Sequence, residues 1–216
     1  MPKFVDAALR RQEVVEAVFR IVAADGLERA SLREVADEAE LAVGSVRHYF
    51  ASSDELLAHS FGVVVDRIVH RLTAADDRLA DAEPGTPEHH EGVLTLLGEL
   101  LPLDEERAVD ACVWMAFKNA ARTKPFLAAE ADRSHRAVAA VVGRLVMELS
   151  AGAGSADGAG DTLNQQRLVT EAERLLATLD GLTMHALLQP EWMTAQMCRD
   201  VLESHLTGLA SYAGSH

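Results

Sequence analysis

Apolar residues recur at helical spacing along almost the whole chain, and this periodicity limits the fold more than any other feature of the sequence. Val14, Val18, Ile21 and Val22 lie on one face of a helix at this spacing. No convincing run of alternating β-branched residues interrupts the pattern. The six prolines and fourteen glycines fall mostly between the periodic segments. The sequence therefore predicts an all-α protein.

Two capping boxes mark helix starts in the N-terminal third. Ser31 and Glu34 have the spacing at which the serine oxygen accepts from the Glu34 amide while the Glu34 carboxylate reaches back. A helix of about two turns is predicted to start there, and a second short helix follows over 43–50. A second capping box at 52–55 opens a long helix that is predicted to run from 54 to 80.

In the rest of the chain, the apolar pattern predicts five more helices, which are separated by proline and glycine. The predicted helices run from a Thr86 cap to Leu101, from an Asp104 cap to the region before Pro125, from Pro125 to Ser150, over 168–186 and over 198–209. The Gly/Ser-rich run at 150–160 is predicted to be a flexible linker, because it lacks the strand and the Gly-Lys-Ser/Thr of a phosphate loop. Cys112 and Cys198 are predicted to be buried thiols.

The net charge of the chain limits the classes of function that it can have. The chain has 34 acidic and 20 basic residues and a formal net charge of -14, which argues against a protein that coats nucleic acid or anionic membrane indiscriminately. A local nucleic-acid site is still compatible with this balance. No apolar stretch reaches eighteen residues and no signal peptide pattern opens the chain, so we expect a cytoplasmic protein without a membrane partner.

The two short helices have the size and polarity of a helix-turn-helix unit. The second of them presents Ser45, Arg47, His48 and Tyr49 within about one turn, and such side chains are suited to phosphates and base edges. An ordinary helical hairpin with a solvated polar side fits the pattern as well.

Residues 17–57 resemble the DNA-binding domain of TetR/AcrR-family transcriptional regulators. The resemblance lies in Ser31–Ala36, Gly44-Ser45, Tyr49-Phe50 and Asp54–Leu57. It implies a three-helix DNA-binding domain at 1–50 and a helical domain at 51–216 that binds a small-molecule inducer and forms a homodimer. Asp180–Leu188 also resembles the betaine-responsive repressor branch of that family.

The resemblance also implies roles for single residues at the DNA. Gly44 would let the backbone approach a phosphate, Ser45 and Tyr49 would contact phosphate oxygens, and Arg47 and His48 would reach base edges. Ser31 and Arg33 would meet the DNA backbone, although Ser31 could serve as a helix cap alone.

Three positions depart from the family pattern. Glu40 stands where a turn glycine is usual, Ser53 where a phosphate-binding lysine is frequent, and Arg47 where tyrosine is commoner. The base preference of related proteins is therefore not transferred to this chain.

The C-terminal domain supplies two further sets of candidates. Ligand contacts are expected at Trp114, Met115, Phe117 and Lys118 on a central helix, with plain core packing as the alternative, and at Asp180 and Met184. Because an unpaired buried carboxylate is costly, Asp180 faces solvent, pairs with a basic residue or meets a cationic ligand. Contacts between the two copies of a homodimer are expected at Leu179, Gly181, Ala186, Leu202, His205 and Leu209.

No catalytic motif, metal-ligand spacing or cofactor-binding loop is found in the sequence. We therefore expect no catalytic residues, no metal and no cofactor. The leading hypothesis is a repressor that binds a palindromic operator in double-stranded DNA and is released by a small-molecule inducer. The alternative is a helical ligand-binding or adaptor protein that no longer reads DNA.

Overall fold

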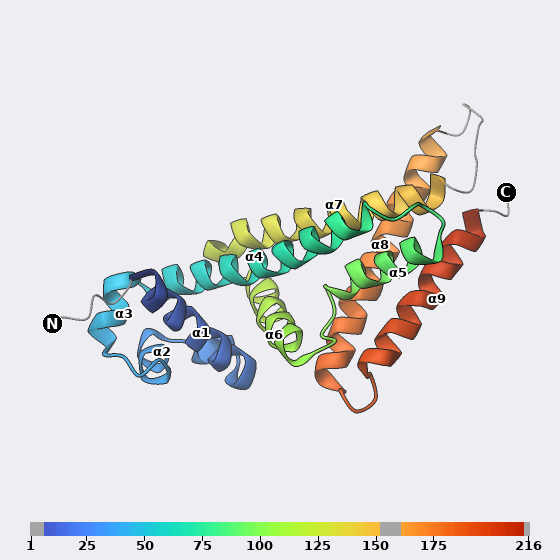
Figure 1. The fold of residues 1–216 in the computed structure, drawn as a ribbon. Coiled ribbons are helices and arrows are strands. Elements are labelled where there is room, and N and C mark those ends of the chain that lie inside the picture. The colour runs from blue at the N-terminus through green and yellow to red at the C-terminus, as the bar shows by residue number, and fades with distance from the viewer. Residues whose placement is uncertain (1–6, 152–160, 214–216) are drawn as a thin grey trace. The chain divides into compact units, whose positions relative to one another are not determined.

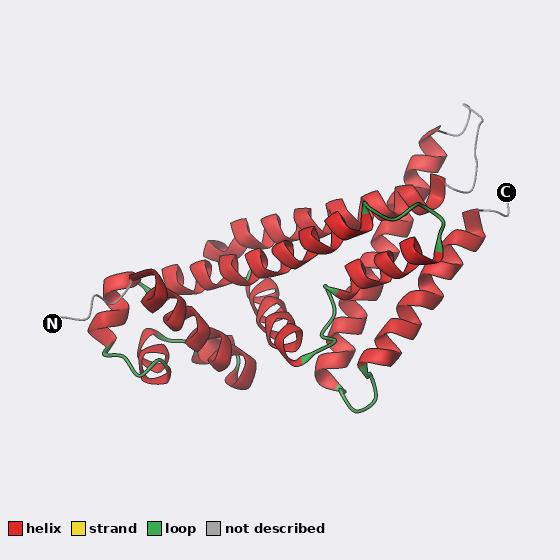
Figure 2. Ribbon diagram, in the orientation of Figure 1, coloured by secondary structure: helices red, strands yellow, loops and turns green. Residues whose placement is uncertain are grey.

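The computed structural model describes residues 7–151 and 161–213, except for the side chains of 151, 161–164 and 209–213. Every regular element in these ranges is helical (Figure 2), as the periodicity predicts. Most of the predicted linker at 150–160 lies outside the described residues. The elements are α1 Ala7–Asp25, η1 Leu27–Arg29, α2 Leu32–Glu38, α3 Val43–Tyr49, α4 Ser53–Leu79, α5 Pro87–Gly98, α6 Glu105–Ala120, η2 Pro125–Leu127, α7 Ala128–Ala151, α8 Asp161–Leu188 and α9 Ala195–Ala213 (Figure 1).

The chain forms two compact units, and neither is continuous in sequence. The first unit contains Met1–Ile68 and Val109–Arg133, and the second contains Val69–Ala108 and Ser134–His216. Helix α4 runs without a break from one unit into the other, and α6 and α7 also contribute to both. The functional boundary between residues 50 and 51 stays a prediction, because compactness reports packing and not which residues bind DNA. Among the described helices, none has the length and apolar character needed to cross a membrane.

Local sequence signals explain where α1 and α2 end and begin. Helix α1 ends at Asp25, and Gly26 follows with φ of 86°, a left-handed conformation that glycine adopts without steric cost. The Ser31 Oγ accepts from the Glu34 amide at 3.2 Å, as predicted. The reciprocal half of this capping box is absent: the Ser31 amide donates to the Arg29 carbonyl, and the Glu34 carboxylate pairs with Arg29.

The second capping box starts α4 in a shifted form. The Ser52 Oγ accepts from the Glu55 amide at 3.1 Å, and the Glu55 carboxylate accepts from the Ala51 amide at 2.8 Å. The carboxylate thus reaches one residue further back than in the predicted box. Asp104 caps α6, as predicted, through the Arg107 amide at 2.8 Å.

The first unit is held together by contacts of α4 with α1 and α6. The rings of Phe61 and Phe117 stack with centroids 5.1 Å apart, and both side chains are fully buried. The Arg67 guanidinium pairs with Glu16 of α1 and with buried Asp110 of α6, and it lies over the Phe19 ring. These contacts fix α6 residues from Val109 onward to the helices of the N-terminal region.

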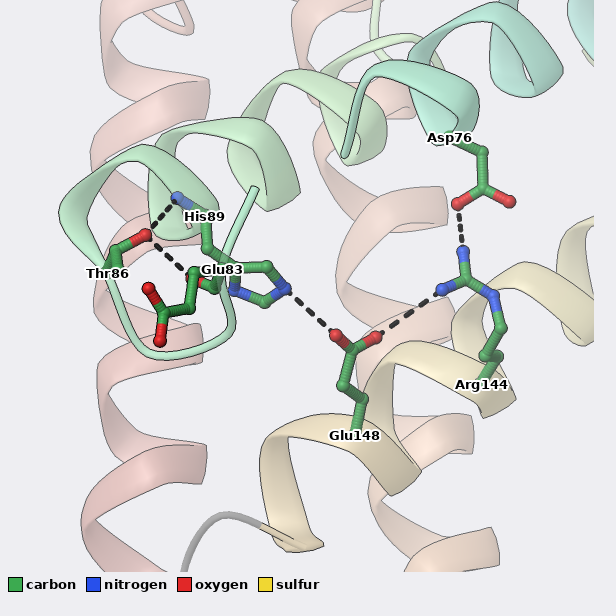
Figure 3. Close-up of polar contacts among 6 residues, drawn as sticks. All are labelled: Asp76, Glu83, Thr86, His89, Arg144 and Glu148. Carbon is green, nitrogen blue, oxygen red and sulfur yellow. Dashed lines mark hydrogen bonds and ion pairs between the residues drawn. The ribbon is translucent and has the colours of Figure 1, made fainter. Parts of the chain in front are cut away.

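In the second unit, α5 is joined to its neighbours by side-chain contacts. Thr86 caps α5 by accepting from the His89 amide, and the His89 Nε2 lies 2.9 Å from Glu148 of α7 (Figure 3). Arg144 contacts Glu148 at 3.4 Å and also pairs with Asp76 of α4. Helix α5 ends at Gly98, three residues earlier than predicted, and a turn reaches Leu101.

Both cysteines are free thiols, as predicted. Cys198 is buried, whereas Cys112 is only half-buried, so the prediction of burial is confirmed for Cys198 alone. Burial raises the pKa of each thiol above its ordinary value.

Candidate nucleic-acid interface

Helices α2 and α3 expose one face because their apolar side chains are packed against the unit. Val35, Ala36 and Val46 are buried, and so is Phe50, the residue that ends α3. These short helices are therefore positioned by packing, since two turns of helix are marginal alone. Their polar residues lie on the opposite side, facing solvent.

The predicted DNA contacts lie on this solvent-facing side. The exposed residues are Ser31, Arg33, Gly44, Ser45, Arg47 and His48, and Tyr49 is half-buried. The Tyr49 and His48 rings meet edge to face with centroids 5.3 Å apart. Ser31 caps α2, yet its hydroxyl keeps its own hydrogen for donation. Both α2 and α3 thus present predicted DNA contacts to solvent.

Ion pairing separates the arginines of this region into two groups. Arg10 pairs with Glu13 at 2.7 Å, Arg20 with Glu38, and Arg29 with Glu34 at 3.5 Å. Arg33 and Arg47 pair with no carboxylate anywhere in ranges 7–151 and 161–213. The arginines of α2 and α3 that the sequence assigns to DNA are thus exposed and have no counter-charge.

The turn between α2 and α3 contains backbone strain. Glu40 has φ of 55°, the left-handed region that disfavours side chains with a Cβ. Glycine, which the resemblance leads us to expect at this position, adopts this region without steric cost. At Gly44 an added Cβ would meet nothing within 4 Å, so the backbone of α3 is open to a close approach from outside.

The predicted ligand contacts divide between the two units. In α6, Phe117 is fully buried against Phe61, Trp114 and Met115 are half-buried, and the half-buried Lys118 places its Nζ 4.3 Å from the centre of the Trp114 ring. Asp180 and Met184 are exposed on α8 in the second unit. That these residues share one ligand site stays a prediction.

The predicted dimer contacts differ in burial. Leu179, Ala186 and Leu202 are buried within their own unit, whereas Gly181 and His205 are half-buried. The side chain of Leu209 lies outside the described residues. The predicted dimer contacts did not include the apolar residues that are exposed on α8, on α9 and between them, of which Met184 was predicted as a ligand contact: Val169, Met184, Leu188, Trp192, Met197 and Val201. Leu188 and Trp192 follow the predicted stripe and flank Pro190, so periodicity gave no signal for them.

Two family models match the chain. The model described as "Bacterial regulatory proteins, tetR family" matches residues 14–59. The model described as "BetI-type transcriptional repressor, C-terminal" matches residues 89–211. The matches therefore include the helix-turn-helix surface and most of the helical remainder.

Individual proteins agree with this assignment. The chain is 34% identical to the HTH-type transcriptional regulator PksA of Bacillus subtilis over 97% of its own length and 94% of that protein. A transcriptional regulator from Rhodococcus sp. Rha1 has a similar structure, with a TM-score of 0.75, 28% identity and coverage of 95% and 98% of the two chains. The multidrug binding protein EbrR, solved in complex with ethidium, matches with a TM-score of 0.59, 26% identity and coverage of 91% and 98%. The chain belongs to the TetR family of bacterial transcriptional regulators.

Proposed function

We propose that this regulator is a homodimeric, cytoplasmic repressor that binds a palindromic operator through α2 and α3 and leaves it when a small molecule binds. It acts by binding and not by catalysis. The observation that carries the proposal is the pair of exposed, unpaired arginines Arg33 and Arg47 on a chain of net charge -14. In so acidic a protein, cations left without a partner on one polar face are suited to phosphates and to guanine edges.

The test of DNA reading is selection of bound fragments from random double-stranded DNA by the purified protein. We expect one enriched sequence with two inverted half-sites, because a two-fold dimer places its two recognition helices in successive major grooves, about 34–36 Å apart. No enriched sequence at low salt would contradict the proposal and favour the ligand-binding or adaptor alternative.

The homodimer is supported by the outer faces of α8 and α9, which lie side by side (Figure 1). Met184 and Leu188 on α8, and Met197 and Val201 on α9, are exposed apolar residues spaced four apart. At Gly181 and Gly208 an added Cβ would meet nothing within 4 Å, which leaves room for the helices of a second copy. A four-helix contact between two copies would cover both faces.

A charge on this face tests the dimer. Leu188 is 72% exposed, so Leu188→Glu should leave the protomer folded but lower the sedimentation coefficient to that of a monomer. Leu9→Glu is the matched control, because Leu9 is 58% exposed on α1, far in sequence from α8 and α9. Sedimentation of the unmodified protein as a monomer at micromolar concentration would contradict the homodimer and with it the palindromic operator.

An organic cation is the class of inducer that we propose. The Trp114 ring already accepts the ammonium group of Lys118 at 4.3 Å, and aromatic faces bind other cations by the same electrostatic attraction. The relative EbrR is described in complex with ethidium. Ethidium is therefore the first probe: it should raise the melting temperature of the unmodified protein and have a smaller effect on Trp114→Ala. An equal shift in both proteins would remove Trp114 from the site.

Release requires that the inducer and DNA prefer different conformations. Helix α4 follows α3 directly and is continuous through both units, so it is the element that we propose to transmit the change. A coupling of roughly 1–3 kcal/mol would weaken operator binding several-fold or more, and by reciprocity the operator would weaken inducer binding by the same factor. Titration of ethidium with and without the selected DNA tests this: equal affinities would contradict release.

A further inference from the structure

Arg11, like Arg33, Arg47 and Arg122, is an exposed cation of the first unit without a carboxylate partner. It lies in the second turn of α1 beside Arg10, yet the two side chains differ in their contacts. Arg10 pairs with Glu13 at 2.7 Å, whereas Arg11 forms no ion pair with any residue in the described ranges. Instead the Arg11 Cζ lies over the Phe50 ring, 4.9 Å from its centre.

Phe50 connects this cation to the recognition helix. It follows Tyr49 directly, ends α3 by donating its amide to the Val46 carbonyl, and is fully buried. The ring therefore has a fixed position, and the guanidinium that rests on it is held at the C-terminal end of α3. A cation held over a ring face by electrostatic attraction keeps its N–H groups available as hydrogen-bond donors.

The two carboxylates that act on His59, whose ring meets Phe50, form no ion pair with Arg11. Arg11 acts on the neighbouring His59, and so do Glu55 and Asp66. The Glu55 carboxylate accepts from the Ala51 amide at 2.8 Å, and Asp66 pairs with Arg133 at 2.7 Å. Both acids are thus bound elsewhere, while the positive charge of Arg11 is exposed to solvent.

We propose that Arg11 is a phosphate contact of the DNA interface, placed in advance by its stacking on Phe50. The inference rests on the proposed DNA-reading role of α2 and α3 and adds a residue from α1 to that surface. An exposed guanidinium without a counter-charge, held over the ring that directly follows the phosphate candidate Tyr49, fits two phosphate oxygens through its fork of N–H donors. Such a contact strengthens binding to every sequence and selects none.

The salt dependence of DNA binding tests this assignment. Each phosphate contact adds about 0.9 to the slope of log K against log salt concentration, because neutralisation releases counterions. For Arg11→Gln we expect several-fold weaker binding to both the selected and a random DNA fragment, with a slope smaller in magnitude by about 0.9. Arg11→Lys should retain the slope, since it keeps the charge.

Arg10→Gln is the matched control, because it removes the same charge from the adjacent position of α1. Its slope should equal that of the unmodified protein, since Arg10 is already paired with Glu13. An unchanged slope in Arg11→Gln, or an equal loss in both variants, would overturn the assignment of Arg11. Unmodified protein that shows no salt-dependent DNA binding would instead overturn the proposed function. Thermal unfolding of each variant checks that the fold is retained.

Discussion

The arginines on the surface of α2 and α3 have no carboxylate partner, whereas several arginines of the second unit form ion pairs. In the second unit, Arg144 pairs with Asp76 and Glu148, Arg107 with Glu99 and Asp104, and Arg199 with Glu91. On the surface of α2 and α3, Arg33 and Arg47 are exposed and pair with no carboxylate of the described chain. Acidic residues outnumber basic ones, so partners are plentiful. We expect an anion from outside at Arg33 and Arg47, because Arg78 and Arg122, which are also exposed without a carboxylate partner, donate instead to the Ala74 carbonyl and to Asn119.

This comparison predicts that paired charges act on stability and unpaired charges act on DNA binding. The variants below test the two halves separately, because stability and DNA affinity are measured independently on each protein.

The largest expected effect is the loss of a buried paired charge. Asp110 is 1% exposed and pairs with Arg67 at 3.4 Å. Asp110→Ala should lower the free energy of unfolding by about 3 kcal/mol, the lower end of the range for broken buried pairs, since Arg67 keeps its contact with Glu16. Denaturant titration measures the change. Asp66→Ala is the control, because Asp66 is 70% exposed in its pair with Arg133, and it should cost less than about 1 kcal/mol.

The next largest effect is a loss of DNA affinity when the unpaired Arg47 is removed. Arg47→Ala should weaken binding to the selected DNA by about 1–3 kcal/mol and relax the preference at one base pair. The free energy of unfolding should change by less than about 0.5 kcal/mol, because Arg47 is exposed and unpaired. Competition assays with single base-pair variants measure the preference. Tyr49→Phe should instead weaken binding to all sequences alike. An equal loss by Arg47→Ala on specific and random DNA would refute the base contact.

A smaller effect is expected from the strained turn on the DNA-binding surface. Glu40→Gly should raise the free energy of unfolding by up to about 1 kcal/mol, because φ of 55° is unfavourable for a residue with a Cβ. Gly26→Ala should lower the free energy of unfolding, because Gly26 has φ of 86° and alanine would be strained there. Thermal or denaturant unfolding of both variants tests the pair. Destabilisation by Glu40→Gly would show that the Glu40 side chain makes a compensating contact.

The smallest effect is a pH dependence of the first unit. Burial, and then the charge of Arg11, lower the pKa of His59 below its ordinary value of 6.5, although Asp66 and Glu55 act in the opposite direction. The fold therefore favours neutral His59. This contribution to stability is complete above pH 6.5 and is lost as the pH falls through the pKa of the folded state. His59→Gln should make the decline of unfolding free energy between pH 7.5 and 5 less steep, and identical slopes would contradict the assignment.

Local chemistry made much of the fold predictable. Ser31, Ser52, Thr86 and Asp104 cap the helices that the sequence assigns to them, because a cap depends on atoms within three residues of one another. The carboxylate halves of the two capping boxes were less predictable. Glu34 is drawn to Arg29 and Glu55 to the Ala51 amide, since a long side chain has several partners within reach.

The exposure of the predicted DNA contacts also followed from local sequence, because α2 and α3 are adjacent and short. The pairing of the cations did not. Arg20 meets Glu38 eighteen residues away, and Arg67 meets Asp110 forty-three residues away. Which arginines lack a carboxylate partner depends in part on such long-range contacts, and Arg11, which lies over Phe50, was not among the predicted DNA contacts.

The sequence by itself determined that the faces containing Leu179 and Leu202 are covered, because an apolar stripe at helical spacing must leave water. It did not determine what covers them. The tertiary structure places these residues in the core of their own unit and leaves Leu188 and Trp192 exposed. The physical reason is that the hydrophobic effect depends on the apolar area removed from water and not on which surface covers it. Burial of apolar surface is favourable both within the chain and against a second copy, although association with a second copy also costs translational and rotational entropy. The packing of the other helices decides which residues are covered within the chain.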